Sequence, residues 1–457
     1  MQLSFFSPKE GQSIRYKIFL SSKLGHLYKS LPLTELSALL PQSKNKDGAR
    51  PWFSSKGKIA LQFLKIYEDC SDEKLLERIN ANWALQIFCG IHLAPNQQIK
   101  DKDLIWKTRK YVAEYLSIQQ TQGILIQAWK PYMEQTDIGM SDATCYESYI
   151  KYPTDVKLLW DCNTWLHHQI KYYSKCLALA CPRNKFKDQR KRQLVYARKK
   201  RKTWKADRNR RLWLLKLLKK LLSQLKVLLV YSEALPIEDK NTCVAEEQTW
   251  DKYRLIKKIY EQQLFHFESP EESVPNRVVS LYKPYLRPIV RGKEKKRVEF
   301  GAKVNTWQVS GLNFIEHLSF SAFHEGNRLN NGIAWHKKHF EELLKVAADR
   351  LYATNANRTL CKKLNISTSF RPKGRRTNDL VLRKQEDVLR TALSKARATM
   401  LEGSYGNDKN HYGLHKVKAR NEKTEVAWIF FGMMTANALK IAKRRQTRAP
   451  VKLLVAA

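Results

Sequence analysis

The placement of strand-like segments constrains the fold of this chain more than any other feature. β-branched and aromatic residues typical of strands occur at about 137–152 and return at 278–320. Residues 155–267, which lie between them, show the apolar spacing of helices instead. The strand-like segments can therefore meet in one sheet only if a long helical segment is inserted between them.

Strand and helix signals alternate after this inserted segment. A helix at about 333–344 leads into an apolar run at 346–348, and a helix at 354–364 precedes a short strand at 367–370. This order favours an α/β fold with helices on the faces of a sheet. The other expected elements are two short strands within 137–152, strands at 278–281, 298–304 and 314–320, and long helices at about 380–402 and 425–444.

Residues 1 to about 135 show helical periodicity. Asp72 follows Ser71 and precedes Leu75, as a residue that caps a helix does. One interpretation of this region is a helix-turn-helix that contacts DNA, and the other is a small helical bundle with solvated lysines. Candidate phosphate contacts under the first interpretation are Lys56, Lys58, Lys107, Arg109 and Lys110.

Length and charge limit the class of protein. The 457 residues are too many for one typical core, so two or three domains are expected. The 84 Lys and Arg residues outnumber the 43 Asp and Glu residues, which gives a formal net charge of +41. A field of this sign implies a polyanionic partner. Nucleic acid is the leading candidate, although ribosomal and membrane-surface proteins are basic too.

Cysteine usage and hydropathy indicate a cytoplasmic, nucleoid-associated protein. The eight cysteines form no CxxC pair and no zinc-type spacing with histidines, which is typical of reduced thiols. The apolar part of the N-terminus is too short for a signal peptide. No uncharged stretch reaches the roughly 20 residues needed to span a bilayer. We therefore expect a soluble protein that does not span a membrane, with DNA rather than a membrane as its partner.

The most basic part of the chain, residues 183–226, lies inside the inserted segment. Its C-terminal half is amphipathic, and Leu214, Leu218, Leu221 and Leu225 form a leucine stripe that must be buried. Three interpretations stay open: DNA contact, packing against a domain or subunit, and binding to a membrane surface. The candidates for DNA contact are Arg198, Lys199, Lys200, Arg201, Lys202 and Arg208, with Trp204 available to stack on a splayed base.

Three acidic residues stand in settings unusual for surface carboxylates. Asp142 and Asp349 each follow a short apolar run, where a strand ends and its last side chain can face a cleft. Glu402 ends a helix and is followed by Gly403, which leaves its carboxylate room. Converging oxygen ligands suit Mg²⁺ or Mn²⁺, and two such ions can activate an attacking oxygen and stabilise a leaving one. Competing acids are Asp137 and Asp155 for the first position and Glu422 and Glu425 for the third.

Several short sequence blocks, which together cover most of the chain outside the basic segment, resemble those of a known family and occur in the same order. They are 58–67, 71–78 and 84–90; 141–144 with 152–155; 287–293 and 299–304; 348–352 with Asn357; and 402–406 with Lys409 and Asn437. Together they resemble the DDE transposases of bacterial insertion sequences, specifically the insertion-sequence-five superfamily that carries an InsH-like N-terminal domain.

The resemblance implies a ribonuclease-H-like fold, a mixed sheet flanked by helices, in which Asp142, Asp349 and Glu402 bind the metal ions. It also implies that Lys409, seven residues after Glu402, contacts DNA at the transposon end. Related enzymes often carry an arginine four residues before the glutamate. Here Ala398 stands at that place, and Arg397, the candidate for this phosphate contact, is displaced by one residue.

The implied function is a DNA transposase that binds terminal inverted repeats and catalyses metal-dependent strand cleavage and strand transfer. Its expected partners are double-stranded DNA, at the element ends and the target, and further copies of the chain on that DNA. A catalytically inactive or domesticated DNA-binding relative and a structure-specific nuclease on the same fold stay open as alternatives. The expected domains are a helical DNA-binding domain at 1–135, a ribonuclease-H-like catalytic domain at 136–155 and 275–450, and a basic helical insertion at 156–274.

Overall fold

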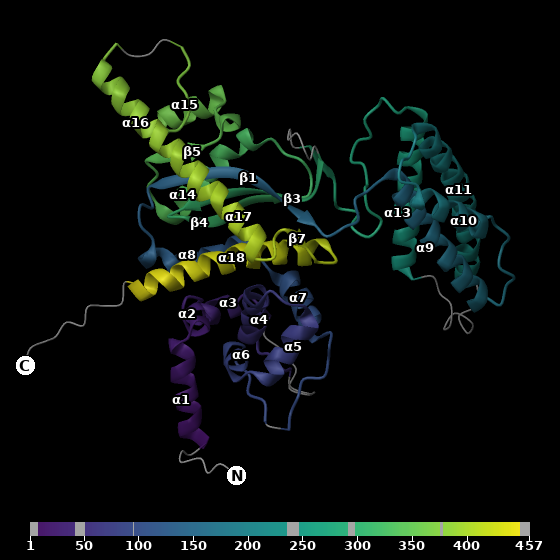
Figure 1. Cartoon of the computed structure of the whole chain (residues 1–457), viewed down its shortest axis with the longest axis horizontal. Coiled ribbons are helices and arrows are strands. Elements are labelled where there is room, and N and C mark those ends of the chain that lie inside the picture. The colour runs from purple at the N-terminus through teal and green to yellow at the C-terminus, as the bar shows by residue number, and fades with distance from the viewer. Residues whose placement is uncertain are drawn as a thin grey trace, which may run out of the picture. The chain divides into compact units, whose positions relative to one another are not determined.

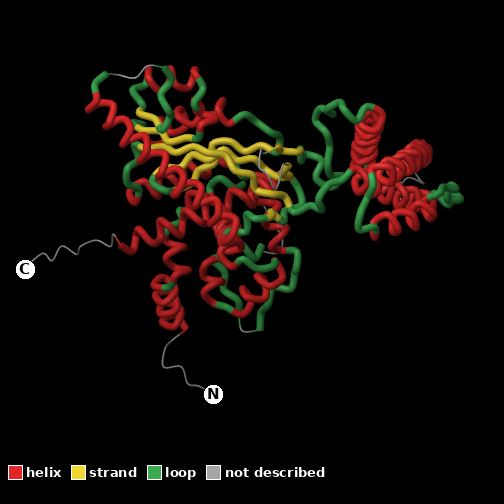
Figure 2. The backbone as a smooth tube through the Cα atoms, turned by 45° about the horizontal axis from the view of Figure 1, so that its top comes forward, coloured by secondary structure: helices red, strands yellow, loops and turns green. Residues whose placement is uncertain are grey.

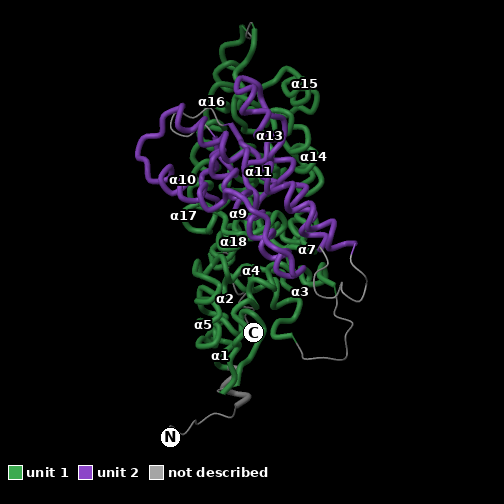
Figure 3. Tube along the Cα trace, turned by 90° about the vertical axis from the view of Figure 1, so that its right-hand side faces the viewer, with its two compact units in different colours: residues 1–149, 301–457 green, residues 150–300 purple. Residues whose placement is uncertain are grey.

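The computed structural model describes residues 8–41, 51–94, 96–234, 246–290, 298–374 and 378–447. The chain divides into two compact units (Figure 3). Unit 1 comprises residues 1–149 and 301–457, and unit 2 comprises residues 150–300. The last part of the sequence block at 287–293 lies outside the described residues.

The central strand of unit 1 is β1 (Ile138–Ser148), which runs through the middle of the sheet in Figure 1. It pairs antiparallel with β3 (Val298–Val309) from Gly139 to Glu147, and β3 pairs antiparallel with β4 (Leu312–Ser319). The expectation of two short strands within 137–152 is wrong. β1 is continuous because β3 pairs with its backbone along nearly its whole length.

The other edge of β1 is shared by two strands. β5 (Lys345–Ala348) runs parallel to its first residues, and β7 (Lys416–Val417) runs parallel to its last two. β6 (Ser367–Thr368) continues the sheet beyond β5. Between β5 and β7, the middle of β1 contacts the turn η4 (Arg397–Leu401) instead. The sheet is therefore mixed, and it is curled as well as flanked by helices (Figure 2).

Helices pack on both faces of this sheet. α14 (Leu329–Phe340) packs on the face that carries the Trp307 ring, where the Trp307 indole donates to His336 (3.1 Å). The face formed by alternate residues of β1 carries an apolar cluster that includes Met140, Leu393 and Leu401. The helical path over this cluster is α16 (Leu380–Ala396), η4 and α17 (Glu402–His411), which extends beyond the expected end at residue 402.

Helix α18 (Glu422–Thr447) lies between the sheet and the N-terminal helices (Figure 1). It contacts β4 on one side and α2, α4 and α7 on the other, so residues 429–438 are all buried. The remaining helical elements of unit 1 are α1 (Pro8–Ser21), α2 (Lys23–Lys29), α3 (Leu33–Ser37), α4 (Ser55–Glu68), α5 (Asp72–Ala81), α6 (Trp83–Phe88), α7 (Leu104–Tyr115), α8 (Ile118–Trp129), α15 (Asn355–Lys363) and the 3₁₀ turns η1 (Lys130–Tyr132), η2 (Glu325–Arg328) and η3 (Arg350–Tyr352).

The start of α5 differs from the sequence expectation. Ser71, not Asp72, caps the helix, because its hydroxyl accepts from a backbone amide of the first turn (3.1 Å). Asp72 instead pairs with Arg109 (2.7 Å) and Lys65 (2.9 Å). The guanidinium of Arg109 also lies 4.7 Å from the ring centroid of Trp428. Arg109 is therefore an internal ion-pair partner rather than the expected phosphate contact.

Unit 2 is built on a helical bundle. The four leucines of the stripe are fully buried among α9, α11 and α13, which confirms that the stripe is covered. Each fully buried leucine contributes about 1.5–3 kcal/mol, so the stripe is a main source of stability for the bundle. Among the described helices, none has the length and apolar character needed to cross a bilayer. The helices are α9 (Asp155–Cys176), α10 (Phe186–Arg198), α11 (Trp204–Ala234) and α13 (Glu247–Glu268).

The expected strand at 278–281 is wrong. Val278 and Leu281 are buried in the apolar core of the bundle. Side chains of α13 hold the backbone there: the Val278 amide donates to Gln262 (3.0 Å), and Lys252 donates to the Leu281 carbonyl (2.7 Å). The chain then forms β2 (Pro288–Val290), which pairs antiparallel with residues 298–300 of β3.

Candidate active site

The register of β1 and β5 brings the first two acids together. Their parallel pairing aligns Ser141 with Ala348, and the next residues are Asp142 and Asp349. Neighbouring strands lie roughly 5 Å apart, so the two side chains start from neighbouring positions. Asp349 directly follows its strand, as predicted. The expectation that Asp142 ends a strand is wrong, because β1 continues along β3 after β5 has ended.

Glu402 reaches the same place from the helical layer. The turn η4 is π-helical, and the backbone amide of Glu402 bonds to the carbonyl of Arg397. Glu402 is therefore the first residue of α17, and the expectation that it ends a helix is wrong because Gly403 continues that helix. Bonding from residue i to i+5 places Arg397 and Glu402 on one face, as a spacing of four does in an α-helix.

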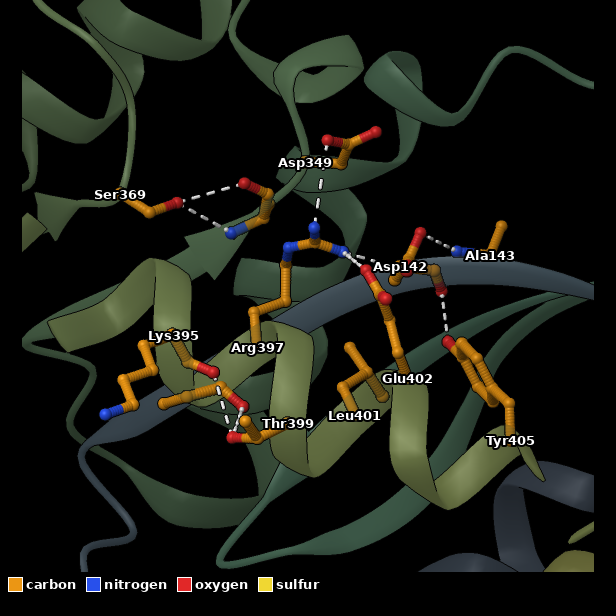
Figure 4. Close-up of polar contacts among 12 residues, drawn as sticks. Asp142, Ala143, Asp349, Ser369, Lys395, Arg397, Thr399, Leu401, Glu402 and Tyr405 are labelled. Atoms are coloured by element: carbon orange, nitrogen blue, oxygen red, sulfur yellow. Dashed lines mark hydrogen bonds and ion pairs between the residues drawn. The ribbon is translucent and has the colours of Figure 1, made fainter. Parts of the chain in front are cut away.

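The guanidinium of Arg397 lies among the three carboxylates (Figure 4). Its Nη1 is 3.1 Å from Asp142 Oδ2 and 2.9 Å from Glu402 Oε1, and its Nη2 is 3.9 Å from Asp349 Oδ1. The side chains of Arg397 and Asp142 are 15% and 16% exposed, whereas those of Asp349 and Glu402 are 44% and 51% exposed. The cluster thus has a buried base and an open rim through which a substrate can approach.

Burial raises the pKa of Asp142 to about 6, because a carboxylate loses hydration when it is covered. The backbone amide of Ala143, which donates to Asp142 (2.8 Å), and the charge of Arg397 oppose this rise in pKa, and the carboxylates of Glu325 and Asp349 add to it. Additional positive charge at this position therefore favours the ionised form of Asp142.

Three side chains support the acids from behind. Tyr405 donates to the backbone carbonyl of Asp142 (2.9 Å; Figure 4). Ser369 holds the end of β5 by bonding both the amide and the carbonyl of Ala348, each at 3.0 Å. Lys409 donates to Thr144 Oγ1 (3.1 Å), two residues beyond Asp142 on the same strand. The position of Tyr405, three residues after Glu402 on one helix face, is the sequence signal that could have assigned it a role.

A buried polar group under the site was not found from the sequence. Asp408 accepts from the Tyr146 hydroxyl (2.9 Å) and lies 3.5 Å from the Asn313 amide, which also donates to Ser404 (2.7 Å). Burial raises the pKa of Asp408 to about 6. Asn437 bonds the backbone of Asn313 (3.0 and 2.7 Å), which ties α18 to this network. The residues of this network come from four separate elements, so no local sequence spacing predicts that they meet.

The competing acids occupy other settings. Among the described residues, the carboxylates that pair with Arg397 are those of Asp142, Asp349 and Glu402. Asp137 accepts a backbone bond from β5 before β1 begins, Asp155 pairs with Arg277 and Arg211 in unit 2, Glu422 is the first residue of α18, and Glu425 is buried against the Ser148 hydroxyl.

The basic candidates lie in unit 2, at the junction of α10 and α11. Arg198 and residues 199–202 are exposed, and the Trp204 side chain is 70% exposed. The guanidinium of Arg208 lies against the rings of Trp204 (5.4 Å) and Phe267 (4.6 Å). Within unit 2, the structure therefore gathers these residues on one segment that is largely exposed.

The three carboxylates suit a hard divalent cation. They supply only oxygen donors, and they already converge on one positively charged group. In the described part of the chain, no group of three or more His, Cys, Asp or Glu side chains is gathered closely enough to hold a metal ion as it stands. Metal binding would thus require Arg397 to give up part of its contact with the acids.

Comparison with known proteins supports this interpretation of the site. Residues 346–439 match a family model described as a transposase DDE domain. The match runs from β5 into α18 and includes Asp349, Arg397 and Glu402. It supports a DDE transposase, a class of enzymes that acts on DNA and generally uses divalent metal ions. Searches of curated proteins and of solved structures found no match.

Proposed function

We propose that the chain is a DNA transposase of an insertion sequence, which binds terminal inverted repeats and cleaves and joins DNA strands. One observation carries this proposal: the carboxylates of Asp142, Asp349 and Glu402, from three separate segments, meet at the Arg397 guanidinium. Asp142 lies outside the residues that match the family model, so its place in the cluster is an independent observation.

The domain organisation follows from the same proposal. The mixed sheet of unit 1 is compatible with a ribonuclease-H-like core, built from residues 136–155 and 275–450. The N-terminal helices of residues 1–135 are proposed to bind DNA, and residues 156–274 form the basic helical insertion. The insertion-sequence-five superfamily and the InsH-like N-terminal domain remain part of the prediction.

The proposed cofactor is Mg²⁺ or Mn²⁺, held by Asp142, Asp349 and Glu402. When bound, such ions supply the charge that activates an attacking oxygen and stabilises the leaving one. The chain supplies the positions: β1 and β5 fix the two aspartates, and Tyr405 holds the backbone beside Asp142. Arg397 offsets part of the negative charge of the cluster while the DNA is absent and is free to contact a phosphate once the acids bind ions.

Two phosphoryl transfers complete the proposed reaction. In the first, a water oxygen bonds to the phosphorus at the element end, and the bond from that phosphorus to the 3′ oxygen breaks. This leaves a 3′-hydroxyl on the element and a 5′-phosphate on the flanking DNA. In the second, the 3′ oxygen bonds to a target phosphorus and displaces a target 3′ oxygen. The attacking hydroxyl loses its proton to solvent, and the displaced oxygen takes up a proton to become a hydroxyl. Catalysis of this kind depends mostly on positioning and charge neutralisation.

The proposed partners are double-stranded DNA and further copies of this chain assembled on it, in a nucleoid-associated, cytoplasmic setting. The basic segment of unit 2, with Arg198, Trp204 and Arg208, is proposed to contribute DNA contacts. Lys409 is proposed to contact the element end because its ammonium donates to Thr144, which lies two residues after Asp142 on β1.

Substitution of the acids tests the proposal. Asp142→Asn, Asp349→Asn and Glu402→Gln should each abolish strand cleavage, because each removes a charged oxygen ligand, while binding to the element ends survives. Glu422→Gln is the matched control, since Glu422 is exposed on α18 and should leave cleavage intact. Full cleavage by any one of the three variants in Mg²⁺ would rule out the assignment. Cleavage that ignores the inverted repeats would favour a structure-specific nuclease.

A further inference from the structure

A cleft of about 670 Å³ opens in unit 1, with Lys409 in its lining. Its walls come from the end of α4, the start of α5, α7 and α18, and the segment from the end of α17 through β7. We refer to it as the basic cleft, because its lining includes Lys65, Arg109, Lys409, Lys416 and Lys418. Two acids, Asp69 and Asp72, line it as well.

The inner wall of the basic cleft is built from paired and largely buried charged side chains. Lys65 and Arg109 are 7% and 8% exposed, and both pair with Asp72. The Trp428 ring lies within cation–π distance of both, at 5.7 Å from Lys65 and 4.7 Å from Arg109. These contacts hold Lys65 and Arg109 in the inner wall. The exposed lysines of the cleft lie at its rim.

The rim carries two exposed lysines at β7, of which Lys416 is the first residue of the strand and Lys418 directly follows its last. Lys416 and Lys418 are exposed, and Val417 between them is fully buried. This alternation is that of a strand, and β7 is anchored because Lys416 pairs with Glu147 and Val417 with Ser148 of β1. Both ammonium groups therefore project from the same side of β7, at the cleft.

Lys409 connects the basic cleft to the acids. It lines the cleft and donates to Thr144 Oγ1 (3.1 Å). Thr144 lies two residues after Asp142, so both side chains point to the same face of β1. A chain of phosphates that places one phosphate at Asp142 can thus continue past Lys409 to the two lysines of the rim.

We propose that the basic cleft binds the sugar–phosphate backbone of the DNA strand next to the phosphate that is cleaved. This inference rests on the proposed function and names the path of its substrate. The volume of the cleft falls within the range of small-ligand pockets, roughly 300–1,000 Å³, so it holds a backbone segment of one strand rather than a whole duplex. Its contacts are with phosphates, and binding there is independent of base sequence.

Charge reversal at the rim tests this proposal in the full chain. The variant Lys416→Glu/Lys418→Glu is compared with Lys337→Glu/Lys338→Glu, which makes the same charge change at exposed residues near the end of α14. Binding to a fluorescent DNA duplex of arbitrary sequence is measured by anisotropy against salt concentration, without divalent ions.

The rim variant should bind at least about tenfold more weakly than the control, and its slope of log affinity against log salt should fall by about two, since each lost phosphate contact removes roughly 0.9. Equal weakening in both variants would overturn the proposal, because only total charge would then matter. Circular dichroism of both variants checks that they fold.

Protection of Cys70 gives a second measurement. This half-buried cysteine lines the basic cleft, so DNA bound there should slow its alkylation at least about fivefold, and the rim variant should lose this protection. Alkylation at the same rate with and without DNA contradicts the proposal. Neither measurement involves catalysis. If DNA protects Cys70 but the chain never cleaves DNA, the proposed function is refuted and the proposed binding site is retained.

Discussion

The contacts of Arg397 show how three acids can lie together in a chain without a bound cation. Carboxylates that share a site repel one another, and a positive charge close to them relieves that repulsion. The pattern of related transposases places an arginine one residue later, at Ala398, so the sequence alone left the position of Arg397 displaced. In the structure, Arg397 contacts both Asp142 and Glu402 despite this offset of one residue from the family pattern.

Removal of this counter-charge should make the fold dependent on divalent ions. Arg397→Gln should lower the free energy of unfolding by about 2–4 kcal/mol without such ions, because it leaves a partly buried charge unpaired. Mg²⁺ should restore more stability to this variant than to the wild type, as a ligand of the native state does. Denaturant unfolding with and without Mg²⁺ measures both effects.

Arg390→Gln is the control for this experiment. Arg390 lies on the preceding helix and pairs with Asp387 rather than with the acids. Its substitution should cost less than about 1 kcal/mol and should not change the response to Mg²⁺. An equal response of the two variants to Mg²⁺ would show that Arg397 does not occupy the cation position.

Asp408 should make stability depend on pH in the acidic range. Its pKa is about 6 in the folded chain and close to 3.8 when unfolded, so the native state binds the proton more tightly. This group therefore favours folding most at low pH, and its contribution falls as pH rises from about 4 to about 6. Asp408→Asn removes the titration, so its stability relative to wild type should improve between about pH 4 and about pH 7.

Denaturant unfolding of the two proteins across this pH range tests the effect. Asp251→Asn is the control, because Asp251 is exposed on α13. A stability difference between Asp408→Asn and wild type that stays constant with pH would mean that Asp408 titrates normally in the fold.

At the scale of elements, the π turn η4 explains how Arg397 and Glu402 can meet although their spacing differs by one residue from the family pattern. Glu402 lies five positions after Arg397, and a π turn places residues at this spacing on one face. The helices on each side keep their packing, with Leu393 before the turn and Leu401 at its end both buried. Sequence periodicity predicted a helix here but could not predict this turn, because hydrophobic spacing does not distinguish one extra residue from a helix end.

Deletion of Ala398, which is exposed within η4, should convert the turn to an α-helix. Arg397 would then stand four residues before the glutamate and keep its ion pair, so we expect metal-dependent cleavage to fall less than about tenfold. Deletion of Ser394 is the matched control. It also removes one residue from the helical path, so we expect a regular α-helix to replace the π turn. Arg397 would then lie five positions before the glutamate in an α-helix, where the two side chains do not share a face.

The Ser394 deletion should therefore reduce cleavage far more than the Ala398 deletion. Single-turnover cleavage rates, measured beside circular dichroism spectra, make the comparison. Equal rates for the two deletions would show that the face shared by Arg397 and Glu402 has no role in cleavage.

The strands illustrate what local pattern can and cannot predict. The apolar runs before Asp142 and Asp349 correctly predicted strands β1 and β5, because β-branched residues favour such segments. The sequence does not predict that β1 is one continuous strand through Ser148, since this continuity depends on pairing with β3, far along the chain. The segment at 278–281 was mistaken for a strand because burial against a helical bundle demands the same residue types.

At the scale of the whole molecule, much of the positive charge is concentrated in unit 2. Neutralising Arg198 and residues 199–202, all exposed, should weaken binding to every DNA sequence. The salt slope should fall by roughly 0.9 for each phosphate contact that is lost. Neutralising five other exposed lysines, 216, 219, 220 and 226 of α11 and 258 of α13, controls for total charge and should change the slope less. An unchanged slope in the first variant would assign that segment to packing.

The sequence predicted the organisation of the chain better than the geometry of its site. Composition predicted a nucleic-acid partner, and the leucine stripe predicted a buried helical face. The meeting of Asp142 with Asp349 depends on a strand register that spans more than 200 residues, roughly half the chain, which no local pattern encodes. The domain boundaries stay a prediction beside the two observed units.

Metal-dependent cleavage by the wild-type chain tests the central claim most directly. The substrate is a duplex that carries the terminal inverted repeat which the proposal expects to flank the gene, with Mg²⁺ present or removed by a chelator. We predict a cut at the end of the repeat that leaves a 3′-hydroxyl, stops on chelation and resumes when Mg²⁺ is restored. Undiminished cleavage after chelation would contradict the claim that Asp142, Asp349 and Glu402 hold the metal ions of a transposase.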